Sequence, residues 1–274
     1  MDVRYRFLFE QMVRRELRQK YKGSLLGVAW YVVNPLVLMG AYYLMFGVVF
    51  PVVQYEDYPL FLMAGLVVWL FFSQSLLSAA PSLLDQGALV RKARFPRETI
   101  PAAVVTVQLV TFLLVLTLLG VVMVAVRGTL EPALLALLTP VTIAIRGTGA
   151  GLLVLPLVLV CLFAFVLGFA LAVSVLHAYF RDVAPILSAA LLPWFFVSPI
   201  FFQVDSITHR EWARELLTWA NPVAPFITAI RQPLYLGTLP DAATLAYVAA
   251  AATVAFVAGR ALFARMQAEL AVVV

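Results

Sequence analysis

Six apolar stretches, each long enough to cross a lipid bilayer, constrain this 274-residue chain more than any other feature. A transmembrane helix needs about 20 predominantly apolar residues, and helices are favoured there because they satisfy their backbone hydrogen bonds internally. The stretches are Val32–Val53, Leu60–Leu84, Ile100–Val126, Leu152–Leu176, Val183–Phe202 and Ala242–Phe263. They predict an all-α polytopic membrane protein with six transmembrane helices.

The composition argues against a soluble enzyme. Of the residues, 64% are hydrophobic and 12% are charged, whereas soluble domains carry about 25% charged residues. The length suits one membrane domain over residues 1–274 and leaves no room for a second large soluble domain. The net charge is +5, but the cations lie at the borders of the apolar stretches. We therefore expect a multi-pass protein of the cytoplasmic membrane and no nucleic-acid partner.

The distribution of Lys and Arg predicts the orientation. With the N-terminus inside, 14 of the 19 cations fall in cytoplasmic segments. Cytoplasmic loops carry the excess of Lys and Arg, so we expect both termini in the cytoplasm. The apolar segment 132–145 leaves one alternative open, because it is short and Pro140 interrupts it. It is either re-entrant or a seventh span, and a seventh span would move the C-terminus outside.

Residues 4–22 are predicted to form a basic amphipathic helix. Apolar side chains recur at helical spacing along one face, and Arg6, Glu10 and Arg14 form a row of i, i+4 neighbours on another. Such a helix tends to lie in the headgroup plane of the membrane. It serves either as a simple anchor or as a platform for a cytoplasmic partner. We assign residues 1–30 to this interface helix and 31–265 to the six-span domain.

Two segments outside the spans have a composition that suggests more than a connection. The loop 85–99 contains the sequence RKARFPRE; it is either a solvated loop whose cations fix topology or a short docking helix that presents Phe95 to a soluble subunit. The outer segment 204–235 contains two short amphipathic pieces separated by Asn221-Pro222. These pieces either pack on the surface or form a re-entrant lid over an exit.

Motifs for chemistry on this chain are absent from the sequence. It contains no GxxxxGK[ST], HExxH, CxxC or GxSxG pattern, and its two histidines fall in different border segments. We therefore expect no catalytic residue, no metal site and no cofactor on the chain itself. Acidic residues are missing from the spans, which argues against an ion-driven carrier. Transport would need energy from a nucleotide-hydrolysing partner.

Aromatic residues are frequent within the spans. They either pack helices and face lipid, or they line a pore whose aromatic faces suit a sliding glycan. The candidates for a pore lining are Tyr42, Tyr43, Phe46, Trp69, Phe72, Trp194 and Phe196.

The residues 14–36, RRELRQKYKGSLLGVAWYVVNPL, resemble the entrance of type-2 ABC exporter permeases, most closely the branch that exports polysaccharide, O-antigen, capsule or teichoic acid. The resemblance rests on a Tyr-x-Gly-Ser-x-Leu-Gly pattern followed by Trp30 and Asn34-Pro35. Further similar stretches are AYFRDVAPIL (178–187), SPIFF (198–202) and NPVAPFITAIR (221–231). The matches are in chain order and cover nearly the whole length. Residues 132–151 depart from the pattern, because the outer connection is longer than usual.

The resemblance implies a homodimer that docks two copies of a separate ATP-binding cassette subunit, on which ATP and Mg²⁺ would be bound. The implied docking residues are Arg14, Arg15, Arg18, Lys20, Tyr21, Arg91, Lys92, Arg94, Phe95, Pro96, Arg97, Glu98, Arg181 and Asp182. The implied external gate residues are Trp212, Trp219, Asn221, Pro222, Pro225 and Arg231. A channel would be lined by the first, second and fifth spans.

The function expected from this resemblance is the export of a lipid-linked glycan. Three rivals stay open. One is a type-2 ABC exporter of a drug, a lipid or haem. The second is a membrane-embedded transferase, although clustered acids or histidines at one membrane face are not found. The third is a structural or scaffold membrane protein, which would not require a partner ATPase.

Overall fold

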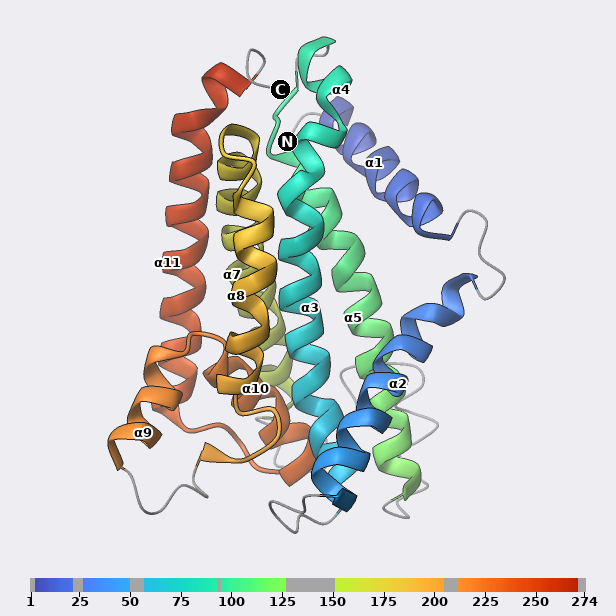
Figure 1. Ribbon diagram of the computed structural model, residues 1–274, viewed down its shortest axis with the longest axis vertical. Helices are drawn as coiled ribbons and strands as arrows, with labels where there is room; N and C mark the ends of the chain where they lie inside the picture. Colours follow the sequence, from blue (N-terminus) through green and yellow to red (C-terminus); the bar gives the residue numbers. More distant parts are fainter. Residues whose placement is uncertain are drawn as a thin grey trace.

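The computed structural model describes residues 3–21, 27–49, 57–92, 95–126, 151–204 and 211–270, and every regular element within these ranges is helical (Figure 1). The long helices are α1 (Val3–Tyr21), α2 (Trp30–Tyr43), α3 (Tyr58–Asp85), α5 (Thr99–Val126), α7 (Gly151–Tyr179), α8 (Val183–Val197) and α11 (Ala242–Met266). The short α-helices are α4 (Gly87–Lys92), α9 (Glu211–Glu215) and α10 (Ala224–Arg231). Three π-helical turns follow α2, α9 and α10, namely η2 (Leu44–Val49), η5 (Leu216–Ala220) and η6 (Gln232–Leu236).

The helices confirm the prediction of an all-α membrane protein. Five segments are long and apolar enough to cross a membrane: Val32–Val49, Tyr58–Asp85, Thr99–Met123, Val154–Tyr179 and Ala242–Met266. Their bounds agree with five of the six predicted spans to within a few residues. The predicted segment 132–145 lies outside the described residues.

The predicted fifth span, 183–202, is only partly a helix. The helix α8 has 15 residues and ends at Val197, five residues before the predicted end. Ser198 leaves the helix with an extended backbone (φ −82°, ψ 144°). It precedes Pro199, and the residue before a proline is pushed out of the helical region by a clash with the proline ring. At about 1.5 Å per residue, α8 is about 22 Å long, which is shorter than the other candidate spans.

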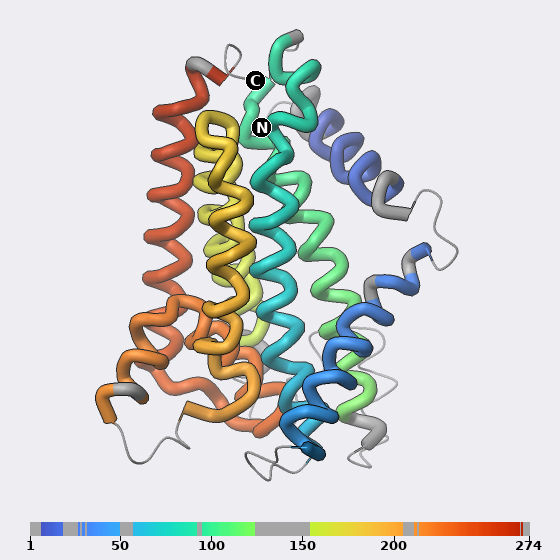
Figure 2. The backbone as a smooth tube through the Cα atoms, viewed as in Figure 1, coloured from blue at the N-terminus to red at the C-terminus, as the bar shows by residue number. Residues whose placement is uncertain are grey.

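The chain passes back and forth between two ends of the bundle. Helices α2, α5 and α8 run in one direction, and α3, α7 and α11 return in the other (Figures 1 and 2). One end holds α1, α4 and the last turns of α11, and we call it the α1–α4 end. The other holds α9 and α10, and we call it the α9–α10 end.

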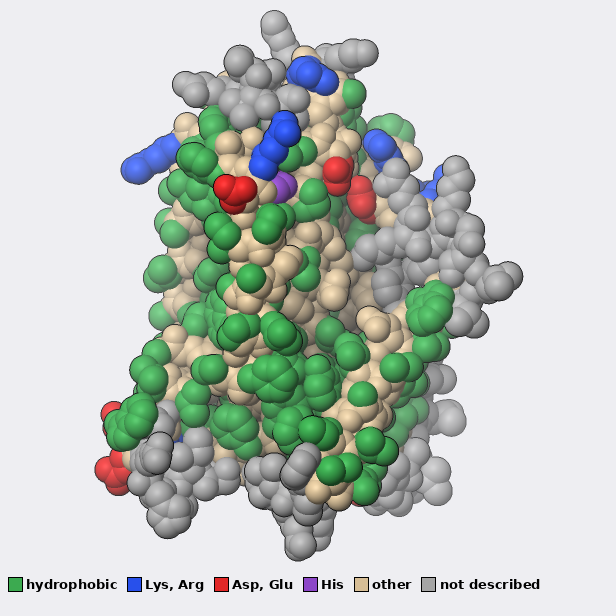
Figure 3. Space-filling view, in the orientation of Figure 1, with side chains coloured by type: hydrophobic (Ala, Val, Ile, Leu, Met, Phe, Trp, Pro, Cys, Tyr) green, Lys and Arg blue, Asp and Glu red, His purple; other side chains and the backbone are tan. Residues whose placement is uncertain are grey.

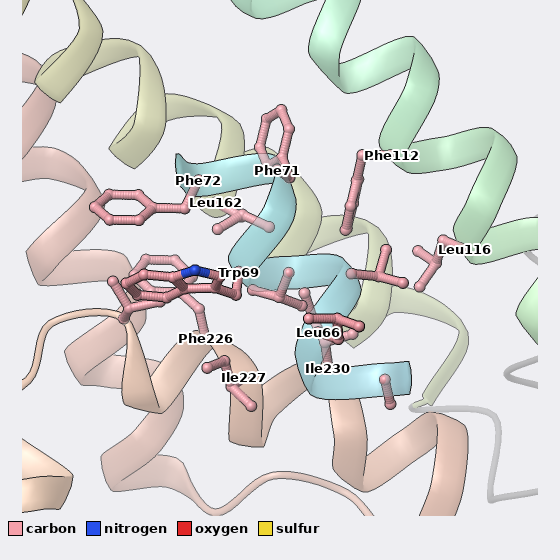
Figure 4. Packing of buried hydrophobic residues seen from close by; sticks show 14 of the residues in the cluster. Leu66, Trp69, Phe71, Phe72, Phe112, Leu116, Leu162, Phe226, Ile227 and Ile230 are labelled. Carbon is pink, nitrogen blue, oxygen red and sulfur yellow. The ribbon is translucent and has the colours of Figure 1, made fainter. Parts of the chain in front are cut away.

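Helix α3 lies at the centre of the bundle. In its most apolar window, 83% of the residues are buried, which is the highest share among the five candidate spans. Figure 4 shows the side chains Phe72 and Phe71 leaving α3 in different directions, with Phe112 of α5 facing Phe71. The core therefore surrounds this helix.

Helices α7 and α11 form the most extensive helix pair. Gly168 and Gly259 meet at the crossing, and a Cβ added at either position would overlap the backbone of the other helix. Small residues let membrane helices approach closely and gain van der Waals contact. These two glycines are therefore required by the close backbone approach.

The amphipathic helix predicted over residues 4–22 is present as α1. Met12 is buried on its apolar face, in a small cluster with residues from α3, α5, α7 and α11. On its polar face, Arg14 forms an ion pair with Glu10 at 2.6 Å. The apolar face thus fixes α1 against the bundle, and the charged face is left exposed.

Candidate functional site

Exposed charges gather at the α1–α4 end. In Figure 3, blue and red side chains cluster near this end, while green side chains cover the middle of the molecule. The exposed residues from the predicted docking set are Arg14, Arg15, Arg18, Arg91, Arg181 and Asp182. The side chains of Lys20, Tyr21 and Lys92 are not described, and Arg94 lies outside the described residues. The described residues place cations from α1, α4 and the α7–α8 turn at one end of the molecule.

The segment after α4 is bound to the end of α11. The Arg97 guanidinium donates to the backbone carbonyl of Gln267, and Glu98 pairs with Arg260 at 3.7 Å. Phe95 is half-buried and packs against the small cluster that also holds Met12. The short helix expected in loop 85–99 is present as α4 (Gly87–Lys92), but the side chain of Phe95 turns partly inward.

A third contact at the same end had no signal in the sequence. The Tyr179 hydroxyl, at the end of α7, donates to the carbonyl of Met266 at 2.6 Å. Together with the contacts of Arg97 and Glu98, this bond joins the ends of α5, α7 and α11. At the α1–α4 end, side-chain contacts therefore connect the ends of three helices.

Two of the predicted pore aromatics lie in the core. Trp69 is 5% exposed and Phe72 is fully buried. The indole of Trp69 contacts Trp194 (centroids 6.2 Å apart) and Phe195 (5.6 Å), and Phe72 contacts Phe165 (5.9 Å). Edge-on, tilted and stacked ring pairs at these distances stabilise packing. For Trp69 and Phe72, this arrangement favours helix packing over a pore lining.

The other candidate aromatics lie between α2 and α8 or face outward. Tyr42 contacts Phe195 and Phe201 with centroids 5.3 and 5.2 Å apart, and Phe46 lies 4.6 Å from Phe201. In contrast, Tyr43 is 39% exposed and Phe196 is 50% exposed. The outer faces of α2 and α8 thus keep aromatic surface that this single chain does not cover.

Asn221 is the polar centre of the α9–α10 end. Its Oδ1 accepts hydrogen bonds from the Trp194 indole N–H (2.9 Å) and from the backbone N–H of Val223 (3.1 Å). Its Nδ2 donates to the Ser198 hydroxyl at 3.0 Å. An Asn side chain that bonds the backbone two residues on is a common turn device. Asn221 therefore joins the end of α8 to the start of the α10 segment.

Arg231 is buried within the protein and not on an outer surface. Its side chain is 4% exposed and donates to the carbonyls of Pro199 (2.8 Å) and Ile200 (3.0 Å). The guanidinium lies 3.8 Å above the ring centroid of Phe61. Gly65 leaves room for it, because a Cβ there would overlap Nη2. The sequence placed Arg231 in the outer segment, but it gave no sign of these contacts, which connect α3, α10 and the turn after α8.

The remaining gate candidates differ in exposure. Trp212 is 65% exposed, whereas Trp219 packs on Tyr247 of α11 with centroids 5.4 Å apart. Pro222 is half-buried, and Pro225 is buried at the start of α10. The segment thus packs against α3, α7 and α11 through α10, and α9 is exposed.

Within the described ranges, no three His, Cys, Asp or Glu side chains are arranged as metal ligands.

Known proteins resemble this chain over most of its length. The family model described as "ABC-2 type transporter" matches residues 8–235. An O-antigen export system permease protein RfbA from Myxococcus xanthus is 32% identical over 267 residues, covering 97% of this chain and 95% of that protein. A protein of the same name from Klebsiella pneumoniae is 30% identical over 237 residues, covering 85% of this chain and 83% of that protein. These matches confirm the predicted resemblance and a location in the cytoplasmic membrane, and the chain belongs to the ABC-2 type transporter family.

Proposed function

We propose that this chain is the transmembrane subunit of an ATP-driven exporter that moves a lipid-linked polysaccharide across the cytoplasmic membrane. The observation that carries the proposal is the similarity to O-antigen export permeases, which extends over 97% of the chain in one case. The whole chain, residues 1–274, acts as one membrane domain. It performs no chemistry itself, and ATP and Mg²⁺ bind to a separate ATP-binding cassette subunit.

The α1–α4 end is the proposed docking surface for that subunit. Arg14, Arg15 and Arg18 on α1, Arg91 on α4 and Arg181 in the α7–α8 turn are exposed there. Bonds from Arg97, Glu98 and Tyr179 tie the same end to α11. A partner that closes upon binding ATP would therefore move several helix ends together. Only contacts that differ between the two states can drive such a change.

The outer faces of α2 and α8 are the proposed contact with a second copy and the wall of the channel. Leu36 and Val37 on α2 and Val48 on η2 are exposed, as are Leu192 and Phe196 on α8. Two copies facing each other through these helices would enclose aromatic surface from both chains. Two copies of the permease then require two copies of the ATP-binding subunit.

The proposed orientation in the membrane follows from the number of crossings. Six crossings, with α8 and the turn after it as the fifth, would place both ends of the chain in the cytoplasm. The α9–α10 end is then external, and residues 204–235 form the gate segment. Asn221 and Arg231 are held by hydrogen bonds to α8 and its following turn, whereas α9 is exposed.

The rival substrates within the same family are a drug, a lipid or haem. The relatives named O-antigen export permeases favour polysaccharide. A membrane-embedded transferase is disfavoured because the match to the ABC-2 type transporter family covers residues 8–235.

The test is a charge reversal at the docking surface. Arg91→Glu combined with Arg181→Glu is expected to abolish display of the polysaccharide at the cell surface, and to prevent copurification of the ATP-binding subunit. Both side chains are exposed, so the amount of chain in the membrane should stay unchanged. Arg214→Glu, an exposed cation of α9 at the opposite end, is the matched control and should leave copurification intact. Unchanged export and copurification in the double variant would refute the docking surface.

A further inference from the structure

A cavity of about 320 Å³ lies between α1, α3 and α5 at the α1–α4 end. Its polar wall consists of Arg15, Glu16, Ser78, Ser82, Asp85 and Gln86. Apart from Arg15, these side chains belong neither to the proposed docking surface nor to the aromatic core. The cavity is therefore a candidate binding site of its own.

Gln86 indicates that a ligand of this cavity should carry a hydrogen-bond donor. Its side chain is 8% exposed, and its Nε2 donates to Glu16 Oε1 at 3.1 Å. Its Oε1 is buried and accepts no hydrogen bond from any residue in the described ranges. A buried acceptor without a donor is costly. A ligand that brings an N–H donor to this corner would remove that cost after a small rotation of the amide.

The charges around the cavity favour a ligand with both signs. Glu16 and Asp85 provide two carboxylates, and neither forms an ion pair with a described Lys or Arg. Arg15 provides one guanidinium, a group suited to phosphate oxygens. An ammonium group would match the carboxylates and the Gln86 acceptor, and a phosphate would match Arg15.

A second cavity lies next to the first, toward the middle of the bundle. It has a volume of about 220 Å³, lies between α2, α3 and α5, and shares the lining residue Ser78 with the polar cavity. Between the two, the Gln108 amide donates to the Ser78 hydroxyl at 3.0 Å. The apolar part of its lining is Trp30, Pro35, Val67, Leu70, Phe71, Phe112 and Val115, and Asn34, Gln74 and Thr111 add polar groups. A polar pocket at the helix ends beside a largely apolar groove suits a lipid headgroup and its chain.

We propose that these two cavities bind a phospholipid whose headgroup carries a primary ammonium and a phosphate, as phosphatidylethanolamine does. The ammonium donates to Gln86 Oε1 and to the carboxylates of Glu16 and Asp85. The phosphate oxygens accept from the Arg15 guanidinium. An acyl chain lies along the groove between α2, α3 and α5, so the lipid joins the loosely packed α2 to the centre of the bundle.

The same contacts predict selectivity among lipid headgroups. A choline headgroup has the positive charge but no N–H, so it leaves Gln86 Oε1 without a donor. A glycerol headgroup adds no cation, so its phosphate meets two carboxylates and one arginine. The site is defined by Arg15, Glu16, Asp85 and Gln86, and it stands whether or not the exported substrate is a polysaccharide.

The experiment compares three lipids with identical palmitoyl and oleoyl chains. The full-length chain is purified in detergent, delipidated and incubated with phosphatidylethanolamine, phosphatidylcholine or phosphatidylglycerol, and the retained lipid is measured by native mass spectrometry. Phosphatidylethanolamine is expected to bind about tenfold more tightly than phosphatidylcholine, because a hydrogen bond from a charged donor is worth about one decade in affinity. Equal retention of the two lipids, or a preference for phosphatidylglycerol, would overturn the proposal.

Two variants locate the site. Gln86→Leu removes the acceptor with little change in volume, and Glu16→Gln removes one carboxylate from a half-exposed position; each should reduce the preference for phosphatidylethanolamine several-fold. Gln11→Leu, the same substitution as at Gln86 but on the exposed face of α1, is the matched control and should keep the full preference. If Gln86→Leu fails to fold, Glu16→Gln decides alone. An unchanged preference in every folded variant would contradict the assignment.

Discussion

Helices α2 and α3 are both apolar enough to cross a membrane, yet they are buried to very different extents. In the most apolar window, 83% of the residues of α3 are buried inside the chain, compared with 6% in the first span, Val32–Val49. Helix α3 contacts α2, α5, α7, α8 and α10, whereas α2 contacts mainly α3 and, more weakly, α5. Apolar character alone therefore does not indicate whether a membrane helix faces protein or lipid.

The difference suggests two roles. The side chains of α3 fill a packed core, in which Phe61, Leu62, Leu66 and Phe72 are nearly or fully inaccessible. Apart from its contacts with α3, the first span is held by the rings of Tyr42 on α2 and Phe46 on η2, which contact rings of α8 and its following turn. We infer that α3 stabilises the single chain, and that α2 presents a surface to lipid and to a second copy.

The largest effect is expected from a truncation in α3. Phe72→Ala removes a fully buried ring and should lower the free energy of unfolding by about 3–5 kcal/mol, because buried contacts are lost and a cavity remains. The measurement is an SDS titration in mixed micelles followed by circular dichroism. Val37→Ala in α2, where the side chain is 63% exposed, is the control and should change stability by less than about 0.5 kcal/mol. If both variants lowered the free energy of unfolding equally, α3 would not differ from α2 in its contribution to stability.

A smaller effect is expected from the buried arginine that fixes the far end of α3. Arg231→Ala removes the side chain that donates to the carbonyls of Pro199 and Ile200. This loss should lower the free energy of unfolding by about 2–3 kcal/mol. Arg265→Ala, an exposed arginine near the end of α11, serves as the control and should be nearly neutral in the same titration. An unchanged free energy of unfolding in Arg231→Ala would show that the contacts of Arg231 do not hold the α10 segment in place.

The smallest effect is expected on α2 itself. Tyr42→Ala removes two ring contacts with α8 and its following turn. The free energy of unfolding should fall by about 1–2 kcal/mol, because an aromatic pair contributes about 0.5–1.5 kcal/mol beyond burial. The neighbouring Tyr43→Ala, at an exposed position, should cost less. If Tyr43→Ala were the more destabilising variant, the assigned inner and outer faces of α2 would be reversed.

The sequence was sufficient to predict the long helices, because runs of about 20 apolar residues have few alternatives to a membrane helix. It also predicted the amphipathic α1, since the spacing of Leu8, Met12 and Val13 is helical. The helix of the fifth span ends five residues before the predicted end of the span, because the effect of Ser198-Pro199 on the backbone was not weighed against the continuing apolar run.

Side-chain placement was beyond the reach of the pattern. Arg231 is the last residue of the short helix α10, and no pattern in the sequence indicates that it would bind carbonyls more than 30 residues away in the chain. Trp69 and Phe72 were candidates for a pore, but rings from α7 and α8 enclose them. Such contacts depend on how distant helices pack, and a local periodicity contains no information about which neighbour a face will meet.

The most direct test of the central claim is disulfide crosslinking between the exposed faces of α2. Single cysteines replace Leu36 and Val37 of α2 and Met45 and Val48 of η2 in a Cys161→Ala background, and membranes are oxidised before the chain is separated by size. We expect covalent dimers for at least one of these four positions, and none for Val254→Cys or Val257→Cys, which are similarly exposed on α11. Dimers through α11 without any through the first span would contradict the assignment, because α2 would then lack the second copy proposed to cover it.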